Sequence, residues 1–379
     1  MESNKMKKVL IVANVAKEHI LKFHIPTIKM LREEGWQVDV ACAGEEDVPY
    51  CNHQYRMSYK RNPFSIKTIT GIIELRKILK KENYNVIHCH TPTGGVVARL
   101  ASWRLKNRPY VMYTAHGFHF FKGASIMNWL ILFPVEWILS CLTDRLIVIN
   151  KEDYRNAKKY NMQMKDLKML YGMGVDKEKF TKPVSAEVCE ALKNEFNIPS
   201  EEIIFLYVAE ILKNKNQEVL IKALKEVRKK TGKGILLLVG PEHDGGIYKK
   251  LAKDEGIFEY VRFTGWRNDV TSFYAITDIY VASSLREGFG LNLVEAQFAG
   301  LPIIASKNRG HVEIIEDGIN GYLVDPNDVN EYAKKMTALI KDDVLRRKLG
   351  DAGKKSADKF SLEASLKTIK SFYEKNVTE

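Results

Sequence analysis

The chain has 379 residues, of which 45% are apolar and 28% charged, and its formal net charge is +12. A chain of this length is too long for one ordinary core and predicts two domains, and this composition excludes an intrinsically disordered protein. The five cysteines are scattered, odd in number and form no C-x-x-C pair. They therefore argue against a disulfide framework or a cysteine zinc site and favour a reducing cytoplasm.

The excess of positive charge lies entirely in the first half of the chain. Residues 1–180 contain 29 Lys and Arg against 17 Asp and Glu, whereas residues 181–379 contain 30 of each kind. Such asymmetry predicts an anionic partner for the first half only, either nucleic acid or an anionic membrane surface. Nucleic acid is not expected, because no helix-turn-helix, RRM or zinc pattern accompanies the charge.

Short apolar strands alternate with longer helical segments along the whole chain, which is typical of buried parallel sheets in doubly wound α/β domains. The two series of strands meet in a charged and poorly periodic stretch at 172–200. In the first half we expect strands at 9–13, 38–41, 86–90, 110–114 and 146–149, and helices at 21–34, 65–82, 95–105 and 126–142. In the second half we expect strands at 203–209, 235–239, 261–264, 279–282, 302–305 and 322–324, and helices at 218–230, 270–275, 291–299 and 330–341.

Two of these helices are candidates for contact with a membrane. The helix at 65–82 carries the densest basic stretch and places Ile69, Ile72, Ile73, Ile78 and Leu79 on or near its apolar side, although a solvated helix packed on a sheet has the same pattern. The segment 126–142 is short for a span of about 20 residues. It is expected to be an interfacial helix with Trp129 and Trp137 at the surface, or else a buried domain helix. The polar start of the chain is not typical of a secretory signal.

Polar side chains follow the carboxyl ends of several predicted strands, where open α/β sheets bind ligands. They comprise His90, His116, Glu210 to Lys215, Gly265 to Arg267, and Glu287. Neither a strand followed by G-x-G-x-x-G nor a P-loop motif occurs. No metal site is expected at His88-Cys89-His90, because neighbouring residues of a strand point to opposite faces.

The most informative segment holds two glutamates eight residues apart, Glu287 and Glu295. It begins after the apolar run that ends at Ala282, turns at Gly288-Phe289-Gly290 and becomes helical from Leu291. The free amides and the positive dipole end of a helix suit a phosphate, and carboxylates suit hydroxyl groups. The pattern therefore predicts a ligand that carries both phosphate and sugar.

This segment resembles the signature of the retaining glycosyltransferases of family 4, whose donors are nucleotide diphospho-sugars. The segments 90–95 (HTPTGG) and 114–119 (TAHGFH) are similar to those of bacterial capsular and exopolysaccharide glycosyltransferases. The resemblance implies the GT-B fold, in which two doubly wound Rossmann-like domains face each other across a cleft. The basic acceptor domain would be 1–172, the nucleotide-sugar domain 173–358, and a last helix within 359–379 would cross back to the first domain.

The resemblance also implies roles for individual residues. His116 and Glu287 would be catalytic residues that contact the transferred sugar, and Glu295 would bind the ribose hydroxyls. Lys215 matches the lysine that grips the diphosphate, whereas Glu210 stands where the family has an arginine, and Ala209 and Asn216 replace two glycines. Lys213, Arg267 or Arg286 could compensate for that arginine, and Asp269 could simply cap the following helix. The remaining donor-binding positions are Gly288, Phe289, Gly290 and Leu291.

Such an enzyme needs no metal ion or other cofactor, because cations and amides stabilise the departing diphosphate. The resemblance implies a UDP-sugar donor, such as a UDP-N-acetylhexosamine, and a polyprenyl-diphosphate-linked saccharide acceptor. The enzyme would be cytoplasmic and peripherally bound to the inner face of the plasma membrane. Alternatives are transfer to a soluble acceptor, or a UDP-sugar 2-epimerase of the same fold. Hydrolysis is disfavoured, because both glutamates lie on one half of the chain.

Overall fold

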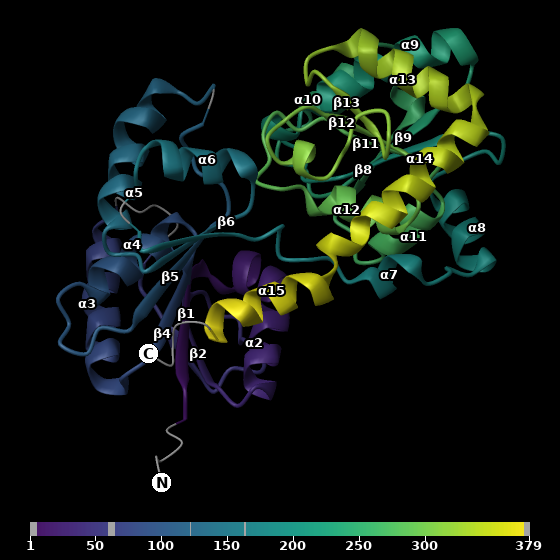
Figure 1. Ribbon diagram of the computed structural model, residues 1–379. Helices are drawn as coiled ribbons and strands as arrows, with labels where there is room; N and C mark the ends of the chain where they lie inside the picture. The colour runs from purple at the N-terminus through teal and green to yellow at the C-terminus, as the bar shows by residue number, and fades with distance from the viewer. Residues whose placement is uncertain (1–5, 60–64, 122, 163, 375–379) are drawn as a thin grey trace. The chain divides into compact units, whose positions relative to one another are not determined.

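The computed structural model describes residues 6–59, 65–121, 123–162 and 164–374. The chain divides into two compact units, which we call the first unit (residues 1–173 and 365–379) and the second unit (residues 174–364). Each unit is a parallel sheet with helices on both faces, so the predicted α/β fold class is confirmed (Figure 1). All five cysteines are free thiols, in agreement with the expectation that no disulfide framework exists.

The first unit is built on a seven-stranded parallel sheet of order β3-β2-β1-β4-β5-β6-β7. Its central strands are almost fully buried, because helices cover both faces and every side chain of these strands must be apolar or paired. The two edge strands, β3 and β7, were not expected from the sequence, since both are short, polar and only partly buried. The strands are β1 (Lys8–Val15), β2 (Gln37–Ala43), β3 (His53–Arg56), β4 (Val86–His90), β5 (Tyr110–Ala115), β6 (Arg145–Val148) and β7 (Asp166–Met169).

Two hydrophobic clusters lie on the two faces of this sheet. One cluster packs the sheet against α3, α4 and α6, and the other packs it against α2 and the C-terminal α15. Tyr373 of α15 anchors that helix, because its hydroxyl forms a 2.6 Å hydrogen bond with Nδ1 of His88. The helices are α1 (Leu21–Phe23), α2 (Ile25–Glu33), α3 (Ile66–Glu82), α4 (Pro92–Ser102), α5 (Phe133–Ser140), α6 (Lys151–Lys159) and α15 (Leu362–Glu374), with π-helices η1 (Ala16–Ile20) and η2 (Asn128–Leu132).

The helix expected at 21–34 is divided into α1 and α2 at His24, and the π-helix η1, which was not expected, precedes α1. Pro26 explains the restart, because a proline lacks an amide hydrogen and is tolerated only in the first turn of a helix. The segment with His19 and His24 lies at the carboxyl edge of the sheet because η1 begins directly after β1 ends at Val15.

The predicted apolar side of α3 is only partly buried. Ile69 and Ile73 are 60% and 52% exposed, whereas Leu79 of the same predicted apolar side is 3% exposed. The buried residues are Thr68, Gly71, Leu75 and Leu79. Gly71 sets this orientation, because a Cβ there would lie 2.5 Å from the ring of Tyr59.

The segment 126–142 forms η2 and α5 and is largely exposed. Ile126, Leu130 and Ile138 are 76%, 67% and 58% exposed, so a buried domain helix is wrong. Throughout the described ranges, no helix has both the length and the apolar character needed to cross a bilayer.

The second unit has a six-stranded parallel sheet of order β10-β9-β8-β11-β12-β13. Because β8, β11 and β12 are neighbours, the loops that follow them meet at one edge of the sheet. The strands are β8 (Ile204–Val208), β9 (Ile235–Val239), β10 (Val261–Gly265), β11 (Ile279–Ala282), β12 (Ile303–Ser306) and β13 (Tyr322–Val324). The helices are α7 (Lys177–Thr181), α8 (Ala186–Glu195), α9 (Gln217–Thr231), α10 (Ile247–Asp254), α11 (Val270–Ala275), α12 (Leu291–Phe298), α13 (Val329–Lys341) and α14 (Asp343–Ser356), with 3-10 turns η3 (Lys213–Lys215), η4 (Phe258–Tyr260), η5 (His311–Glu313) and η6 (Ala357–Phe360).

Candidate active site

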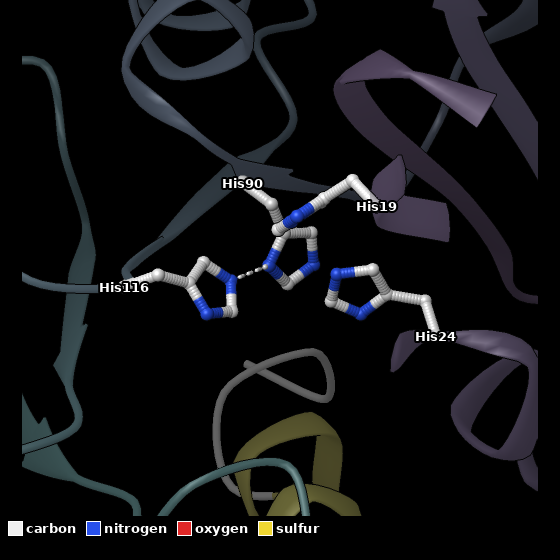
Figure 2. Close-up of side chains that lie close together, drawn as sticks. All are labelled: His19, His24, His90 and His116. Atoms are coloured by element: carbon white, nitrogen blue, oxygen red, sulfur yellow. Dashed lines mark hydrogen bonds between the residues drawn. The ribbon is translucent and has the colours of Figure 1, made fainter. Parts of the chain in front are cut away.

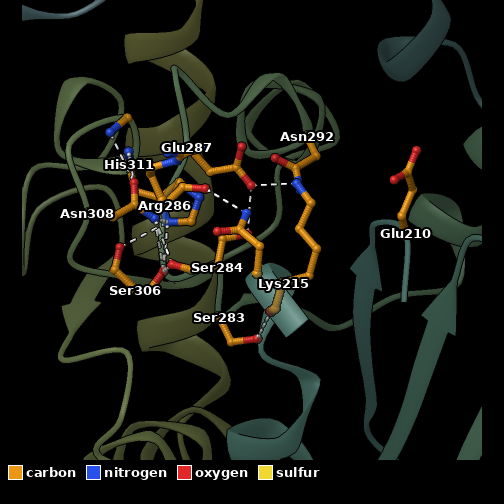
Figure 3. Close-up of polar contacts among 12 residues, drawn as sticks. Glu210, Lys215, Ser283, Ser284, Arg286, Glu287, Asn292, Ser306, Asn308 and His311 are labelled. Atoms are coloured by element: carbon orange, nitrogen blue, oxygen red, sulfur yellow. Dashed lines mark hydrogen bonds and ion pairs between the residues drawn. The ribbon is translucent and has the colours of Figure 1, made fainter. Parts of the chain in front are cut away.

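An ion pair between Lys215 and Glu287 forms the centre of the candidate site in the second unit (Figure 3). Lys215 ends the short η3 turn after β8, and Glu287 lies in the loop after β11. Nζ of Lys215 lies 2.5 Å from Oε1 of Glu287, and the Ser284 hydroxyl donates to the same oxygen at 2.6 Å. The structure thus brings together two residues that are 72 positions apart in the sequence.

The two loops that carry this pair are tied to each other by hydrogen bonds. The Ser283 hydroxyl donates to the Lys215 carbonyl at 2.7 Å, and the Leu285 amide donates to the Asn214 carbonyl at 2.8 Å. Tyr207 of β8 and Ser284 share a 2.7 Å hydrogen bond between their hydroxyl groups. The ion pair is therefore held by a rigid frame, which preorganises it for a ligand.

Both members of the pair are charged at neutral pH. Burial alone would raise the pKa of Glu287, but the Lys215 ammonium, with smaller contributions from His311 and Ser284, outweighs burial and lowers this pKa below its usual value. Burial opposes the charge on Lys215, but Glu287 outweighs it and raises the pKa of the ammonium. A partly buried carboxylate at a strand end can accept hydrogen bonds from hydroxyl groups, and a partly buried ammonium can bind phosphate.

The loop after β12 completes the site, and sequence reasoning did not single it out. Nδ1 of His311 lies 2.9 Å from the Ser306 carbonyl, and Nε of Arg309 donates to the Glu287 carbonyl at 3.3 Å. Gly310 is required between them, because a Cβ there would lie 2.5 Å from the Phe289 carbonyl oxygen. The polar run Ser306–His311 directly follows a predicted strand, and this pattern could have indicated the loop from the sequence.

Gly290 directly precedes α12 and has a φ of +112°, which residues with a side chain rarely adopt. A Cβ there would meet His311 at 3.0 Å. No side chain caps the first turn of α12, so its amides face the loop from Glu287 to Gly290. Phe289 is 4% exposed and its ring packs on Phe360 at 5.4 Å. The Phe289 side chain is thus a core anchor, and only its backbone remains for the predicted donor contact. Gly288 and Leu291 flank this turn.

Glu295 lies one to two turns inside α12, and its carboxylate accepts a 2.7 Å hydrogen bond from the Tyr274 hydroxyl. Burial raises the pKa of Glu295, and the Tyr274 hydrogen bond only partly offsets that effect. Sequence reasoning missed Tyr274, because an isolated tyrosine in a helix gives no local signal of a polar partner.

Arg267 lies in a different ion-pair cluster from Lys215 and Glu287. Its guanidinium donates to Glu195 at 2.6 Å and to Asp269 at 2.8 Å. Asp269 occupies the position before α11 but makes no side-chain cap, so the capping interpretation of Asp269 is wrong. The donor-binding role of Arg267 stays a prediction, and Arg309, whose Nε contacts the Glu287 backbone, is a further cation beside the pair.

The replaced positions of the 209–216 loop are accommodated by the fold. Asn216 takes φ of +54°, the left-handed conformation that asparagine tolerates best after glycine. Its amide donates to the Pro326 carbonyl at 2.7 Å. Glu210 is exposed and lies apart from the Lys215–Glu287 pair in Figure 3. Its carboxylate makes no ion pair with Lys215 among the described contacts, although its negative charge adds to the rise in the pKa of Lys215.

His116 lies in the first unit, directly after β5, where it is partly buried. Burial lowers its pKa to about 4, so the imidazole is neutral at pH 7. Together with His19 it lines a cavity of about 450 Å³. The rest of that cavity is mostly apolar and includes Val96, Leu100, Phe118, Phe120, Leu132, Val135, Ile138 and Leu139.

Comparison with known proteins agrees with this geometry. The families described as "Glycosyl transferase 4-like" and "Glycosyl transferases group 1" match residues 8–150 and 189–356. EpsD of Bacillus subtilis (strain 168), whose name describes a glycosyltransferase, is 38% identical over 368 residues, which cover 97% of this chain and 96% of EpsD. A second relative, the Escherichia coli UDP-Gal:alpha-D-GlcNAc-diphosphoundecaprenol alpha-1,3-galactosyltransferase, is 28% identical over 83% of this chain and 81% of its own length.

The fold is shared with solved glycosyltransferase structures. Anabaena Alr3699/HepE, solved in complex with UDP, superposes with a TM-score of 0.80 at 18% identity over 97% of this chain and 99% of that one. Such low identity supports the fold alone, whereas the match to EpsD covers nearly the whole chain at substantial identity. The chain belongs to the family 4 (group 1) glycosyltransferases with the GT-B fold.

Proposed function

We propose that this enzyme transfers a sugar, with retention of anomeric configuration, from a UDP-sugar to a polyprenyl-diphosphate-linked saccharide in capsule or exopolysaccharide synthesis. The observation that carries the proposal is the Lys215–Glu287 pair beside the uncapped N-terminus of α12. This arrangement combines a cation and free amides for a diphosphate with a carboxylate for sugar hydroxyls.

In this proposal Lys215 and the first amides of α12 bind the diphosphate of the donor. As the bond from the sugar to the diphosphate breaks, negative charge grows on the leaving oxygen, and these groups stabilise it without a metal ion. Glu287, ionised at neutral pH, accepts hydrogen bonds from hydroxyls of the transferred sugar. The UDP complex of HepE and the UDP-galactose substrate named for the Escherichia coli relative support UDP as the nucleotide.

Glu295 is proposed to bind the ribose hydroxyls. Tyr274 holds one of its carboxylate oxygens, Oε2, at 2.7 Å, which fixes the direction of the other oxygen. Two hydroxyls on adjacent ribose carbons can donate to one carboxylate, so this residue would anchor the nucleotide and take no part in bond cleavage.

The acceptor is proposed to bind the first unit at the 450 Å³ cavity. Its apolar lining suits an isoprenoid chain, and His19 and His116 at one side suit the polar head of such a lipid. The diphosphoundecaprenol-linked acceptor named for the Escherichia coli relative supports this class of substrate. An apolar cavity beside His116 also favours transfer over a UDP-sugar 2-epimerase, which needs no acceptor site.

We also propose that the first unit docks on the anionic inner face of the plasma membrane. Apolar side chains are exposed on η2 and α5 and at the start of α3, with lysines on the same α3 helix. Because α4 contacts both α3 and α5, these surfaces lie on one face of the sheet (Figure 1). Exposed apolar groups flanked by lysines are typical of peripheral membrane surfaces. They are Ile66, Ile69, Ile73, Ile126, Met127, Leu130 and Ile138, with Lys67, Lys77, Lys80 and Lys81.

The test is a transfer assay with a panel of UDP-sugars and a synthetic polyprenyl-diphosphate-linked saccharide, with the anomeric configuration of the product read by NMR. We expect Glu287→Gln to lower turnover by at least about a hundredfold while thermal unfolding stays cooperative, because the amide cannot replace the carboxylate. The matched control is Glu210→Gln, which changes an exposed carboxylate apart from the pair. Undiminished turnover in Glu287→Gln would refute the assignment, and an inverted product would refute retention.

A further inference from the structure

Four histidines from distant segments converge at the carboxyl edge of the first-unit sheet (Figure 2). His19 comes from η1 and His24 from the break between α1 and α2, whereas His90 ends β4 and His116 follows β5. One ring nitrogen from each of the four lies within 4.8 Å of those of the other three. Such a group of side chains can hold a metal ion.

Two ring nitrogens of this cluster have no protein partner among the described residues. Nε2 of His19 and Nε2 of His24 are buried and have no hydrogen-bond partner among the described residues. His24 is 1% exposed, so water has little access to its ring. Buried polar atoms without a partner are costly and rare in folded proteins, and each such atom requires an explanation.

The neighbouring His88 differs from the cluster, because both of its ring nitrogens have hydrogen-bond partners. Its Nδ1 forms a 2.6 Å hydrogen bond with the Tyr373 hydroxyl, and its Nε2 forms a 2.8 Å hydrogen bond with the Thr114 hydroxyl. Both ring nitrogens of His88 are therefore occupied, and this residue holds α15 on the sheet. The four clustered histidines lack comparable hydroxyl or carbonyl partners in the described contacts, apart from the contact between His90 and His116.

The spacing within the cluster fits a tetrahedral ion. Nδ1 of His90 lies 3.3 Å from Nε2 of His116. Nitrogen ligands about 2.0–2.1 Å from a tetrahedral Zn²⁺ are separated from each other by about 3.3 Å. The other ligand nitrogens lie within 4.8 Å of these two, so binding of an ion requires side-chain rotations that bring them closer to one point.

The chemistry of the four groups selects a class of ion. Burial, with repulsion from His116, lowers the pKa of His19 to about 2, and burial lowers that of His116 to about 4. The imidazoles are therefore neutral at pH 7, which is the form that ligates metal. Imidazole ligands without a carboxylate suit Zn²⁺, Co²⁺, Ni²⁺ and Cu²⁺, whereas Mg²⁺ and Ca²⁺ require oxygen ligands.

We propose that His19, His24, His90 and His116 bind one transition-metal dication of the zinc class. The ion would tie the segment 16–24 to the ends of β4 and β5, and it would fix the orientation of the His116 ring. The other ring nitrogen of His116 points away from His90 (Figure 2), so this nitrogen stays available to a substrate. The ion belongs to the first unit and is separate from the stabilisation of the diphosphate proposed for Lys215.

The experiment uses the untagged full-length protein, stripped of metal with a chelator and titrated with Co²⁺ alone. We expect one Co²⁺ per chain, the visible absorption bands of tetrahedral Co²⁺ with nitrogen ligands, and displacement of the Co²⁺ by Zn²⁺. His19→Gln and His116→Gln should each weaken binding by more than about tenfold, because each removes a ligand. The control His53→Gln changes an exposed histidine of β3 and should leave binding unchanged.

Two results would overturn the proposal. One is the absence of stoichiometric Co²⁺ binding to the wild-type protein, which needs no variant and does not depend on any variant folding. The other is equal binding by the wild type, His19→Gln and His116→Gln when circular dichroism shows that all three are folded. Neither result depends on transferase activity, so failure here is distinguishable from failure of the proposed function.

Discussion

The Lys215–Glu287 pair gives a stability prediction that can be worked out from the structure. The change is Lys215→Met, which keeps the aliphatic stem and removes the ammonium. Glu287 then keeps its hydrogen bond from Ser284 but loses its partner 2.5 Å away. In the wild type, Lys215 outweighs the effect of burial on the pKa of Glu287. Without Lys215, burial becomes the dominant influence on this pKa.

The magnitude follows from the burial of the two groups. Removing one partner of a fully buried ion pair costs about 3–5 kcal/mol. The side chains of Lys215 and Glu287 are 22% and 18% exposed, so water reaches the pair and lowers the cost. We expect Lys215→Met to lower the free energy of unfolding by about 1–3 kcal/mol at pH 7.5. The double variant Lys215→Met/Glu287→Gln should regain at least about half of that loss, because it leaves no unpaired charge.

The pH dependence has a definite sign. In the wild type the pKa of Glu287 is lowered, so its stabilising contribution is present above its unfolded pKa and is lost as the pH falls. In Lys215→Met, burial should raise this pKa above the unfolded value. The variant is then destabilised most at neutral pH, and protonation of Glu287 removes the penalty as the pH falls. The difference in stability between variant and wild type should therefore shrink between pH 7.5 and pH 4.5.

The assay is urea unfolding followed by circular dichroism at both pH values, with all four members of the double-mutant cycle. Lys213→Met, an exposed lysine of the same η3 turn, is the matched control and should change stability by less than about 0.5 kcal/mol. A coupling energy near zero, or a destabilisation that is the same at both pH values, would refute the reasoning.

Three further predictions concern the metal, the cavity and the membrane. Because Lys215 and the amides of α12 are proposed to stabilise the leaving diphosphate, adding Mg²⁺ to the chelator-treated enzyme should leave turnover unchanged; a several-fold stimulation would contradict the proposed metal-independent mechanism. Val135→Trp should fill the apolar cavity and raise KM for the polyprenyl acceptor by about tenfold or more with little change in KM for the UDP-sugar, whereas Val344→Trp, at an exposed site of the second unit, should change neither. In liposome co-sedimentation, Lys77→Glu/Lys80→Glu should reduce binding to anionic vesicles and high salt should abolish it. The control Lys222→Glu/Lys229→Glu, on α9 of the second unit, should bind as the wild type does, and equal losses in both variants would argue against a membrane surface on α3.

Local sequence pattern determined much of the fold. The strands β4, β9, β11 and β13 have the predicted bounds, because a continuous apolar run between polar turns is readable without any knowledge of its neighbours. The edge strands β3 and β7 were missed, since their polar residues form strands only by pairing with β2 and β6. The sequence left open, for a related reason, which residues of α3 pack on the sheet. Contact between Gly71 and Tyr59 decides which side packs, and the apolar residues of the helix do not reveal it.

The same division applies to the functional residues. The sequence by itself determined that Glu287 and Lys215 follow parallel strands, and parallel strands end at the same edge of a sheet. Only the tertiary structure decided that they form an ion pair and that His311 and Arg309 stand beside them, because this depends on β8, β11 and β12 being neighbours. The four-histidine cluster was invisible in the sequence, whose local spacing reports only residues on one strand or helix. The chain brings His19, His24, His90 and His116 together only because the strand order places β1, β4 and β5 side by side. The segment after β1 and the ends of β4 and β5 then meet at one edge.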